Sequence, residues 1–201
     1  QGVRAIALTW NFANCFGYPN SKDPEIMSKG LTDFGIEAIG EMNRMGIMVD
    51  VSHLSDGGFM DVAKYSKKPF IASHSNCRAL TPHTRNLTDE MIRILAEKGG
   101  ISGLNFGPDF VTPPGEAPDS KVEYLAEHVW HMLQVGGEDC VAMGTDFDGV
   151  GGHLEISHPT QMNQLFDRLA QKGMTSRQLD KFANGNVLRV MTVSYTHLRA
   201  H

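Results

Sequence analysis

The chain has 201 residues, 41% of them hydrophobic, which is enough for one domain with a continuous core. A formal net charge of −5 and a pI near 6.0 leave no basic surface for nucleic acid, so that class of partner is excluded. The three cysteines never occur in CxxC spacing, which argues against a disulfide framework or a thiolate zinc site and is typical of a reducing compartment. No run approaches the roughly 18 apolar residues of a membrane span.

Short apolar runs alternate with helical patterns along the chain. Runs that predict strands, each followed by turn-forming residues, are 3–9, 47–52, 69–73, 101–106 and 140–145. Helical patterns cover 32–45, 88–98 and 161–172. Two further helices are predicted from their capping residues, one that begins at Ser120 with Glu123 and a last one that begins at Thr175 with Gln178. This alternation predicts an α/β fold with a parallel sheet, either a doubly wound sheet or a (β/α)8 barrel of the TIM type.

The residues that follow the strands favour the barrel. Polar or aromatic side chains able to bind a ligand follow all five runs: Trp10 with Asn11, His53, His74, Asn105 with Phe106, and Asp146. The carboxyl ends of barrel strands meet at one mouth, whereas an open sheet gathers only two or three of them at its switch point. No GxGxxG or Walker loop supports the nucleotide-binding version.

Two histidines end consecutive strands, in "VDVSHLS" and "FIASHSN". Neighbouring strands lie roughly 5 Å apart, so His53 and His74 could reach one metal ion with metal–nitrogen distances near 2 Å. A single histidine at such a position is more often structural, but the repetition favours a metal site. The serines that flank His74 could orient its imidazole.

The other polar candidates have ordinary explanations that stay open. Asp146 and Asp148 could cap the turn before Gly149, and Arg85 could be a solvated charge. We expect His128 and His131 to be solvated on the outer face of a helix. We assign at most a substrate contact to three others: His83, His153 and His158.

Four blocks carry a resemblance to a known family: "GVRAIALTWN", "GLTDFGIEAIGEMNRMGIMVDVSHLS", "PFIASHSN" with "RALTPHTRN", and "MGTDFDGV". They resemble the membrane (renal) dipeptidase family of zinc metallopeptidases, family M19, from Gly2 to about Met191. The resemblance implies a (β/α)8 barrel that uses two zinc ions and a metal-activated water to hydrolyse dipeptides. It implies that His53 and His74 hold one zinc, that Arg85 binds the substrate carboxylate, and that Asp146 contacts the substrate and transfers the proton.

The chain departs from the family pattern in two respects. The family takes further zinc ligands from a His-x-Asp pair and a glutamate on earlier strands, and the chain starts after those elements. We therefore expect an incomplete barrel, about the last five βα units over residues 1–193, that is inactive on its own. Trp10 replaces a substrate-contacting histidine. The segment 194–201, "SYTHLRAH", continues no apolar period and is interpreted as a tail of non-native origin, so His197 and His201 are excluded.

The sequence thus predicts a zinc-dependent dipeptidase, cytoplasmic and with a possible homodimer. Export or lipid-anchor signals would lie outside this stretch of sequence. Two alternatives remain: another metal-dependent barrel hydrolase of the amidohydrolase type, or a catalytically inactive binding module. The first commonly has a carboxylated lysine at a strand end, and none of the five strands ends in lysine. The joint presence of His53, His74, Arg85 and Asp146 speaks against the second.

Overall fold

The computed structural model describes residues 2–196. Its strands form one parallel sheet whose spatial order follows the chain: β1 (Ala5–Ala7), β2 (Met48–Asp50), β3 (Ile71–Ala72), β4 (Ile101–Leu104) and β5 (Val141–Met143). Each strand lies within a run predicted from the sequence. A doubly wound sheet reverses its strand order at a switch point, whereas a barrel does not. The prediction of an α/β fold with five consecutive barrel strands is therefore confirmed.

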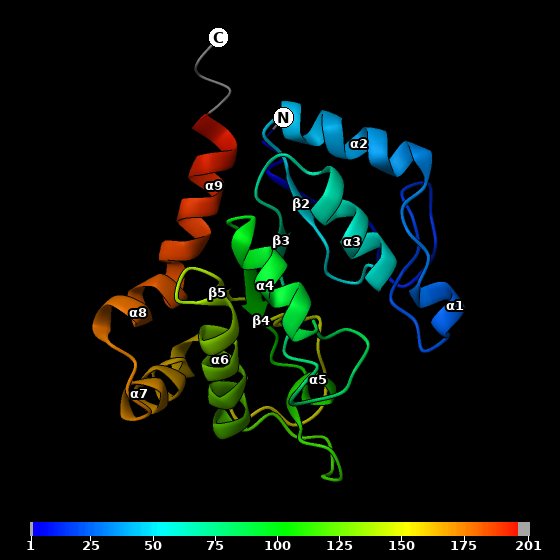
Figure 1. Cartoon of the computed structure of the whole chain (residues 1–201). Helices are drawn as coiled ribbons and strands as arrows, with labels where there is room; N and C mark the ends of the chain where they lie inside the picture. The colour runs from blue at the N-terminus through cyan, green and yellow to red at the C-terminus, as the bar shows by residue number, and fades with distance from the viewer. Residues whose placement is uncertain (1, 197–201) are drawn as a thin grey trace.

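Helices connect the strands and surround one face of the sheet (Figure 1). The α-helices are α1 (Pro24–Met27), α2 (Asp33–Arg44), α3 (Asp56–Tyr65), α4 (Asp89–Glu97), α5 (Pro108–Val111), α6 (Val122–Gly136), α7 (Asn163–Gln171), α8 (Ser176–Asp180) and α9 (Asn186–Thr196). A 3-10 turn, η1 (Pro159–Gln161), precedes α7, and a π-helix, η2 (Lys181–Gly185), joins α8 to α9. Residues 194–196 of the expected tail belong to α9, while 197–201 lie outside the described residues.

One predicted helix cap is present and one is wrong. Thr175 and Gln178 form the capping box of α8. Ser120 does not cap α6, which begins after Lys121 without a side-chain cap. Ser120 instead forms a parallel bridge with Leu154, and the backbone N–H of Val122 donates to the Glu155 side chain at 2.7 Å. The pairing of Ser120 with a distant segment displaces the local cap.

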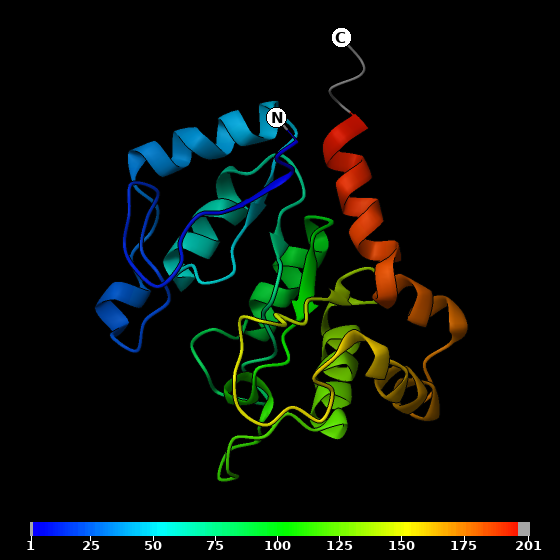
Figure 2. The same ribbon diagram turned by 180° about the vertical axis from the view of Figure 1, so that it is seen from behind.

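The two faces of the sheet bury different apolar clusters. The larger core packs the outer face, with Val49, Ala72, Leu104 and Val141, against the surrounding helices. The smaller cluster lies on the inner face, where Met48, Ile71, Ile101 and Ala142 contact Val190 of α9. In the view from behind, α9 lies beside the sheet, and the segment that follows β5 crosses the end of the sheet that is farther from α9 (Figure 2). Helix α9 thus covers the amino-terminal part of the inner face, and the carboxyl ends of the strands stay accessible.

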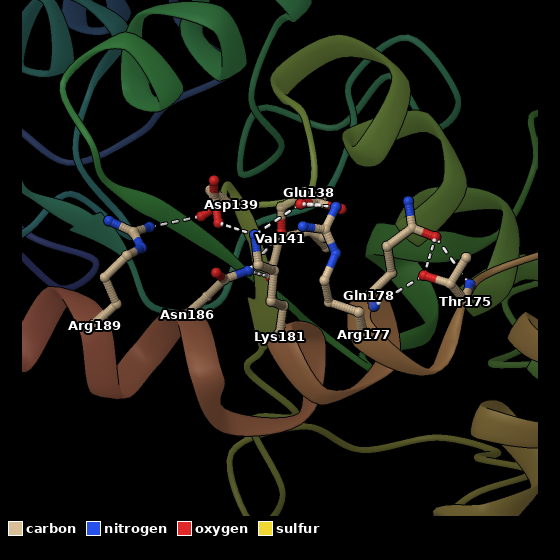
Figure 3. Close-up of polar contacts among 9 residues, drawn as sticks. All are labelled: Glu138, Asp139, Val141, Thr175, Arg177, Gln178, Lys181, Asn186 and Arg189. Atoms are coloured by element: carbon tan, nitrogen blue, oxygen red, sulfur yellow. Dashed lines mark hydrogen bonds and ion pairs between the residues drawn. The ribbon is translucent and has the colours of Figure 1, made fainter.

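An ion-pair network surrounds the amino-terminal end of β5 (Figure 3). Lys181 Nζ lies 2.8 Å from Glu138 and 2.7 Å from Asp139, and Arg177 also pairs with Glu138 at 2.7 Å. The buried Asn186 side chain donates to the carbonyls of Glu138 and Val141, both at 2.8 Å. These contacts attach η2 and α9 to the end of the sheet opposite the candidate site.

Candidate metal and substrate site

The carboxyl ends of all five strands contribute to one hollow region. A cavity of about 340 Å³ is lined by residues that follow β1, β2, β4 and β5, among them Trp10, His53, Phe110 and Asp146. His74, which follows β3, lines an adjoining cavity together with His53 and Asp146. The four site residues predicted from the sequence, His53, His74, Arg85 and Asp146, therefore face a common region, as barrel topology requires.

The two histidines point their Nε2 atoms at each other, 3.0 Å apart. His53 Nδ1 lies 3.0 Å from the side-chain oxygen of Asn11, so this nitrogen carries the proton and donates. His74 Nδ1 lies 2.7 Å from Ser73 Oγ, whose own proton goes to Asp50 at 2.5 Å. His74 Nδ1 is therefore also a donor, and both Nε2 atoms present lone pairs to each other. Two facing lone pairs repel unless a cation lies between them.

The electrostatic surroundings keep both imidazoles neutral. Burial, the Arg85 charge and His74 lower the pKa of His53 to about 3. Burial and Arg85 also lower the pKa of His74, while Asp146 and Asp50 act in the opposite direction. Neutral imidazole is the form that binds metal ions, so at neutral pH neither residue has to lose a proton first.

A buried carboxylate supports His74 from the inner face of the sheet. Asp50, the last residue of β2, accepts from the backbone N–H groups of Ser52 and Ser73, both at 3.0 Å, and from the Ser73 hydroxyl. Ser52 Oγ accepts from the His74 backbone N–H at 3.0 Å. Of the two serines beside His74, Ser73 thus orients the ring, whereas Ser75 Oγ faces Arg85 at 3.4 Å. The Asp50–Ser73–His74 chain fixes the tautomer that leaves Nε2 free.

Arg85 is a buried cation with unused donors. Its side chain is 8% exposed, and its Nε has no hydrogen-bond partner in the part of the chain that the structure describes. Its Nη atoms reach Ser75 Oγ and the His74 carbonyl only at 3.4 Å. Burial lowers the pKa of Arg85 to about 10, so the guanidinium stays charged at neutral pH. A buried charge with weak partners is costly, and an anionic ligand would satisfy it.

Asp146 is held in an uncommon backbone conformation. Three non-glycine residues among those described have positive φ, namely His53 at 70°, Asp146 at 57° and Asp148 at 69°. Two of the three are site residues, and such strain concentrates at functional sites. Asn105 Nδ2 donates to Asp146 Oδ2 at 3.1 Å. A Cβ at position 149 would lie 2.3 Å from Asp146 Oδ1, so a larger residue there would displace this carboxylate.

The remaining histidines have mostly structural partners. His131 contacts Asp89, His153 contacts Asp119, and His158 caps η1. His83 lines the cavity beside Arg85. His128, expected on a solvated helix face, is 1% exposed. Its Nδ1 accepts from the Cys77 backbone at 3.2 Å and its Nε2 lies 3.2 Å from Thr81 Oγ1, so it fixes the loop between His74 and Arg85.

Sequence reasoning missed Asp50, His128 and Asp109. Asp50 and His128 hold the site from outside the cavity, and no local pattern marks such a role. Asp109 lies in α5 and lines the cavity. Its only signal in the sequence is its position shortly after the strand that becomes β4.

The family model described as membrane dipeptidase (peptidase family M19) matches residues 1–198. An uncharacterised protein of Klebsiella pneumoniae is 36% identical over 197 residues, covering 94% of this chain and 72% of its own length. An uncharacterised dipeptidase of Schizosaccharomyces pombe is 36% identical over 192 residues, covering 94% of this chain and 46% of its own length.

Solved structures agree with the sequence matches. Dipeptidase AC, a metallopeptidase of family M19, superimposes with a TM-score of 0.89 and 34% identity over 96% of this chain and 59% of its own. A metallopeptidase of Rhodobacter sphaeroides, liganded with a phosphinate mimic of L-Ala-D-Ala, gives a TM-score of 0.87 and 32% identity over 96% of this chain and 56% of its own. The chain thus spans between about half and three quarters of these relatives. It belongs to the membrane dipeptidase family, peptidase family M19.

Proposed function

We propose that the full-length protein is a zinc-dependent dipeptidase that cleaves the peptide bond of dipeptides with a metal-activated water. The observation that carries this proposal is the 3.0 Å separation of His53 Nε2 and His74 Nε2, with both Nδ1 atoms placed to donate elsewhere. Two nitrogens bound to one tetrahedral zinc at about 2.0–2.1 Å lie roughly 3.3 Å apart, so the pair fits the metal with little movement. When bound, zinc supplies Lewis acidity and a water that ionises near neutral pH.

The residue set also explains the preference for very short peptides. Arg85 would bind the free carboxylate of the substrate, because its buried Nε and weakly bonded Nη atoms form a fork suited to a carboxylate. A substrate whose free carboxylate binds this buried group beside the histidines would place the scissile bond close to its carboxyl terminus, which favours very short peptides. Asp146, hydrogen-bonded by Asn105, would accept a proton from the attacking water and deliver it to the leaving amine.

The complete metal centre is proposed for the full-length protein. In residues 2–196 no group of three or more His, Cys, Asp or Glu side chains could hold a metal ion. Two zinc ions, as the family resemblance implies, would require further ligands. The inactivity expected of the 201-residue chain on its own stays a prediction, and normal dipeptide turnover by that chain would contradict it.

Zinc content and turnover test the proposal together. We expect the purified full-length protein to contain close to two zinc ions per chain and to hydrolyse dipeptides but not tripeptides. Chelation should abolish turnover, and added zinc should restore it. Hydrolysis of a cyclic amide without dipeptide cleavage would instead support the amidohydrolase alternative, and absence of bound metal would support the inactive binding module.

Location and assembly are separate proposals. No helix among the described residues is long and apolar enough to cross a membrane. The cytoplasmic location and the homodimer expected from the sequence stay predictions, which cell fractionation and light scattering of the full-length protein would check.

A further inference from the structure

Asp109 is a carboxylate in the cavity wall for which the proposed reaction has no use. It is exposed, and it lines the cavity together with Arg85, Phe110 and His83. No hydrogen bond or ion pair joins its carboxylate to another of the described residues. The Asp146 carboxylate, by contrast, is held by Asn105. A carboxylate that faces a substrate cavity without a partner is available to contact the substrate.

The backbone around Asp109 is rigid and is attached to the loop that carries Arg85. The Phe110 carbonyl accepts from the side-chain amides of Asn86, at 2.9 Å, and Asn76, at 3.2 Å. Asn86 is the residue after Arg85, so α5 and the arginine are fixed to each other. The Phe110 ring also contacts the Arg85 guanidinium, 5.7 Å from its centroid. The backbone at Asp109 is therefore attached to the loop that carries Arg85.

His83 contacts both Phe110 and Arg85. Its ring packs edge-on against Phe110, with centroids 4.9 Å apart. Its Nδ1 accepts from the Arg85 backbone N–H at 3.1 Å, so Nε2 carries the proton and can donate. Burial lowers the pKa of His83, with Asp109 opposing the shift, so the ring is neutral at pH 7. The charged residues that line the cavity are thus Arg85, Asp109 and Asp146, and Asp109 is the one next to Phe110 in the chain.

We propose that Asp109 selects dipeptides whose carboxyl-terminal residue has a cationic side chain and disfavours those with an acidic one. This inference rests on the proposed function, because Arg85 must hold the substrate carboxylate. The residue that carries this carboxylate then places its own side chain along the wall of Phe110, His83 and Asp109. A lysine or arginine side chain can lay its methylene groups on the Phe110 ring and bring its charge to Asp109.

Charge discrimination is measured on matched substrates. With the zinc-loaded full-length enzyme, we expect kcat/KM to fall in the order Ala-Lys, Ala-Gln, Ala-Glu. Glutamine and glutamate have nearly the same shape, so their difference reports charge alone. Each step should be roughly fivefold, the factor that one exposed ion pair supplies. D109N should bring Ala-Lys and Ala-Glu to within about twofold of each other, and D109K should reverse their order.

A matched control keeps the charge change but moves it out of the cavity. Asp148 is exposed on the same rim and does not line the cavity, so D148N should leave the Ala-Lys to Ala-Glu ratio unchanged. Binding of Ala-Lys and Ala-Glu to the zinc-free protein, followed by NMR titration, measures the same preference without turnover. Tighter binding of Ala-Lys that disappears in D109N supports the inference.

The outcomes separate this inference from the proposed function. If dipeptides are hydrolysed but D109N leaves the ratio unchanged, the role of Asp109 is wrong and the dipeptidase proposal stands. If no dipeptide is hydrolysed, the dipeptidase proposal is wrong, and the NMR titration then decides: equal binding of the two peptides overturns the selectivity as well.

Discussion

The two ends of the parallel sheet each hold an arginine, and the two side chains are bonded differently. At the amino-terminal end, Arg189 donates to the carbonyls of Gly99 and Asp139 at 2.8 and 2.7 Å. At the carboxyl end, the best donor contacts of Arg85 are 3.4 Å long. Both arginines have a buried Nε without a partner among the described residues, and Arg85 lines the cavity of the candidate site.

This difference shows where the fold retains unfavourable interactions. At the amino-terminal end, Lys181 pairs with Glu138 at 2.8 Å and with Asp139 at 2.7 Å. The carboxyl end instead contains a weakly bonded guanidinium, two facing imidazole nitrogens and three non-glycine residues with positive φ among those described. In barrels the carboxyl end provides function and the opposite end provides stability. Substitutions at the two ends should therefore affect activity and stability separately.

The largest effect is expected at the histidine pair. In the full-length protein, H53A or H74A should lower zinc content and reduce kcat roughly 10³-fold or more, because each removes a ligand that the metal needs. Stability of the zinc-free protein should not fall, since either change removes the repulsion between two lone pairs. Metal analysis, kinetics and thermal unfolding check this. H153A, at an exposed histidine, is the control, and wild-type zinc content in H53A would contradict the proposed site.

Arg85 should show the separation of activity from stability most clearly. R85M should lower kcat/KM for dipeptides about 10²–10³-fold, because a charge-assisted bidentate contact is lost. Its Tm should stay level or rise, because a poorly paired buried charge is replaced by an apolar side chain. R85K should recover only part of the activity, since lysine cannot form the bidentate contact. A large fall in Tm with R85M would mean that Arg85 is structural and would remove the contrast between the ends.

How far the sequence predicts this molecule depends on how local each signal is. The five strands were predictable because short apolar runs end in turn residues, and the candidate site residues His53, His74 and Asp146 follow those runs directly. The role of Asp50 was not predictable, because this residue lies inside the predicted strand 47–52. Its role depends on a contact with Ser73, which follows the next strand. The cap at Ser120 failed for a similar reason, since its true partner, Leu154, is distant in the chain.

His128 makes the anchoring of the site loop sensitive to acid. Its burial lowers its pKa from 6.5 to about 4. The unfolded chain therefore binds a proton that the folded chain excludes, and stability is lost as pH falls from about 6.5 toward 4, by roughly 3 kcal/mol in total. Glu138 and Asp139 at the other end have lowered pKa values, so their contribution is lost only at more acidic pH.

Urea unfolding at a series of pH values measures this dependence. H128Q should flatten the stability profile between pH 6.5 and 4, while H131Q, at the neighbouring helix histidine with a partner in Asp89, should leave it steep. The expected difference is confined to this pH window. An unchanged profile in H128Q would show that other groups dominate the acid response.

Asn186 should give the opposite pattern to Arg85. It is 1% exposed and donates to two backbone carbonyls at the amino-terminal end. N186A should cost about 2 kcal/mol of unfolding free energy, because two buried acceptors lose their partner. Activity of the folded enzyme at 25 °C should stay within twofold of wild type. Comparison of urea unfolding with kcat/KM tests both statements, and a loss of activity larger than the loss of folded protein would show that the two ends are coupled.

The smallest effect is expected for the charges of the network itself. Lys181 is 27% exposed at its side chain and pairs with two acidic residues, so K181M removes two ion pairs but little buried surface. Exposed pairs contribute about 0–1 kcal/mol, and their contribution falls with salt. K181M should therefore lower stability slightly at low salt and by almost nothing at 1 M salt, whereas N186A should be insensitive to salt. If K181M proves as costly as N186A at high salt, the amino-terminal end depends on its charges, and the hydrogen bonds of Asn186 are not what attaches α9 to the sheet.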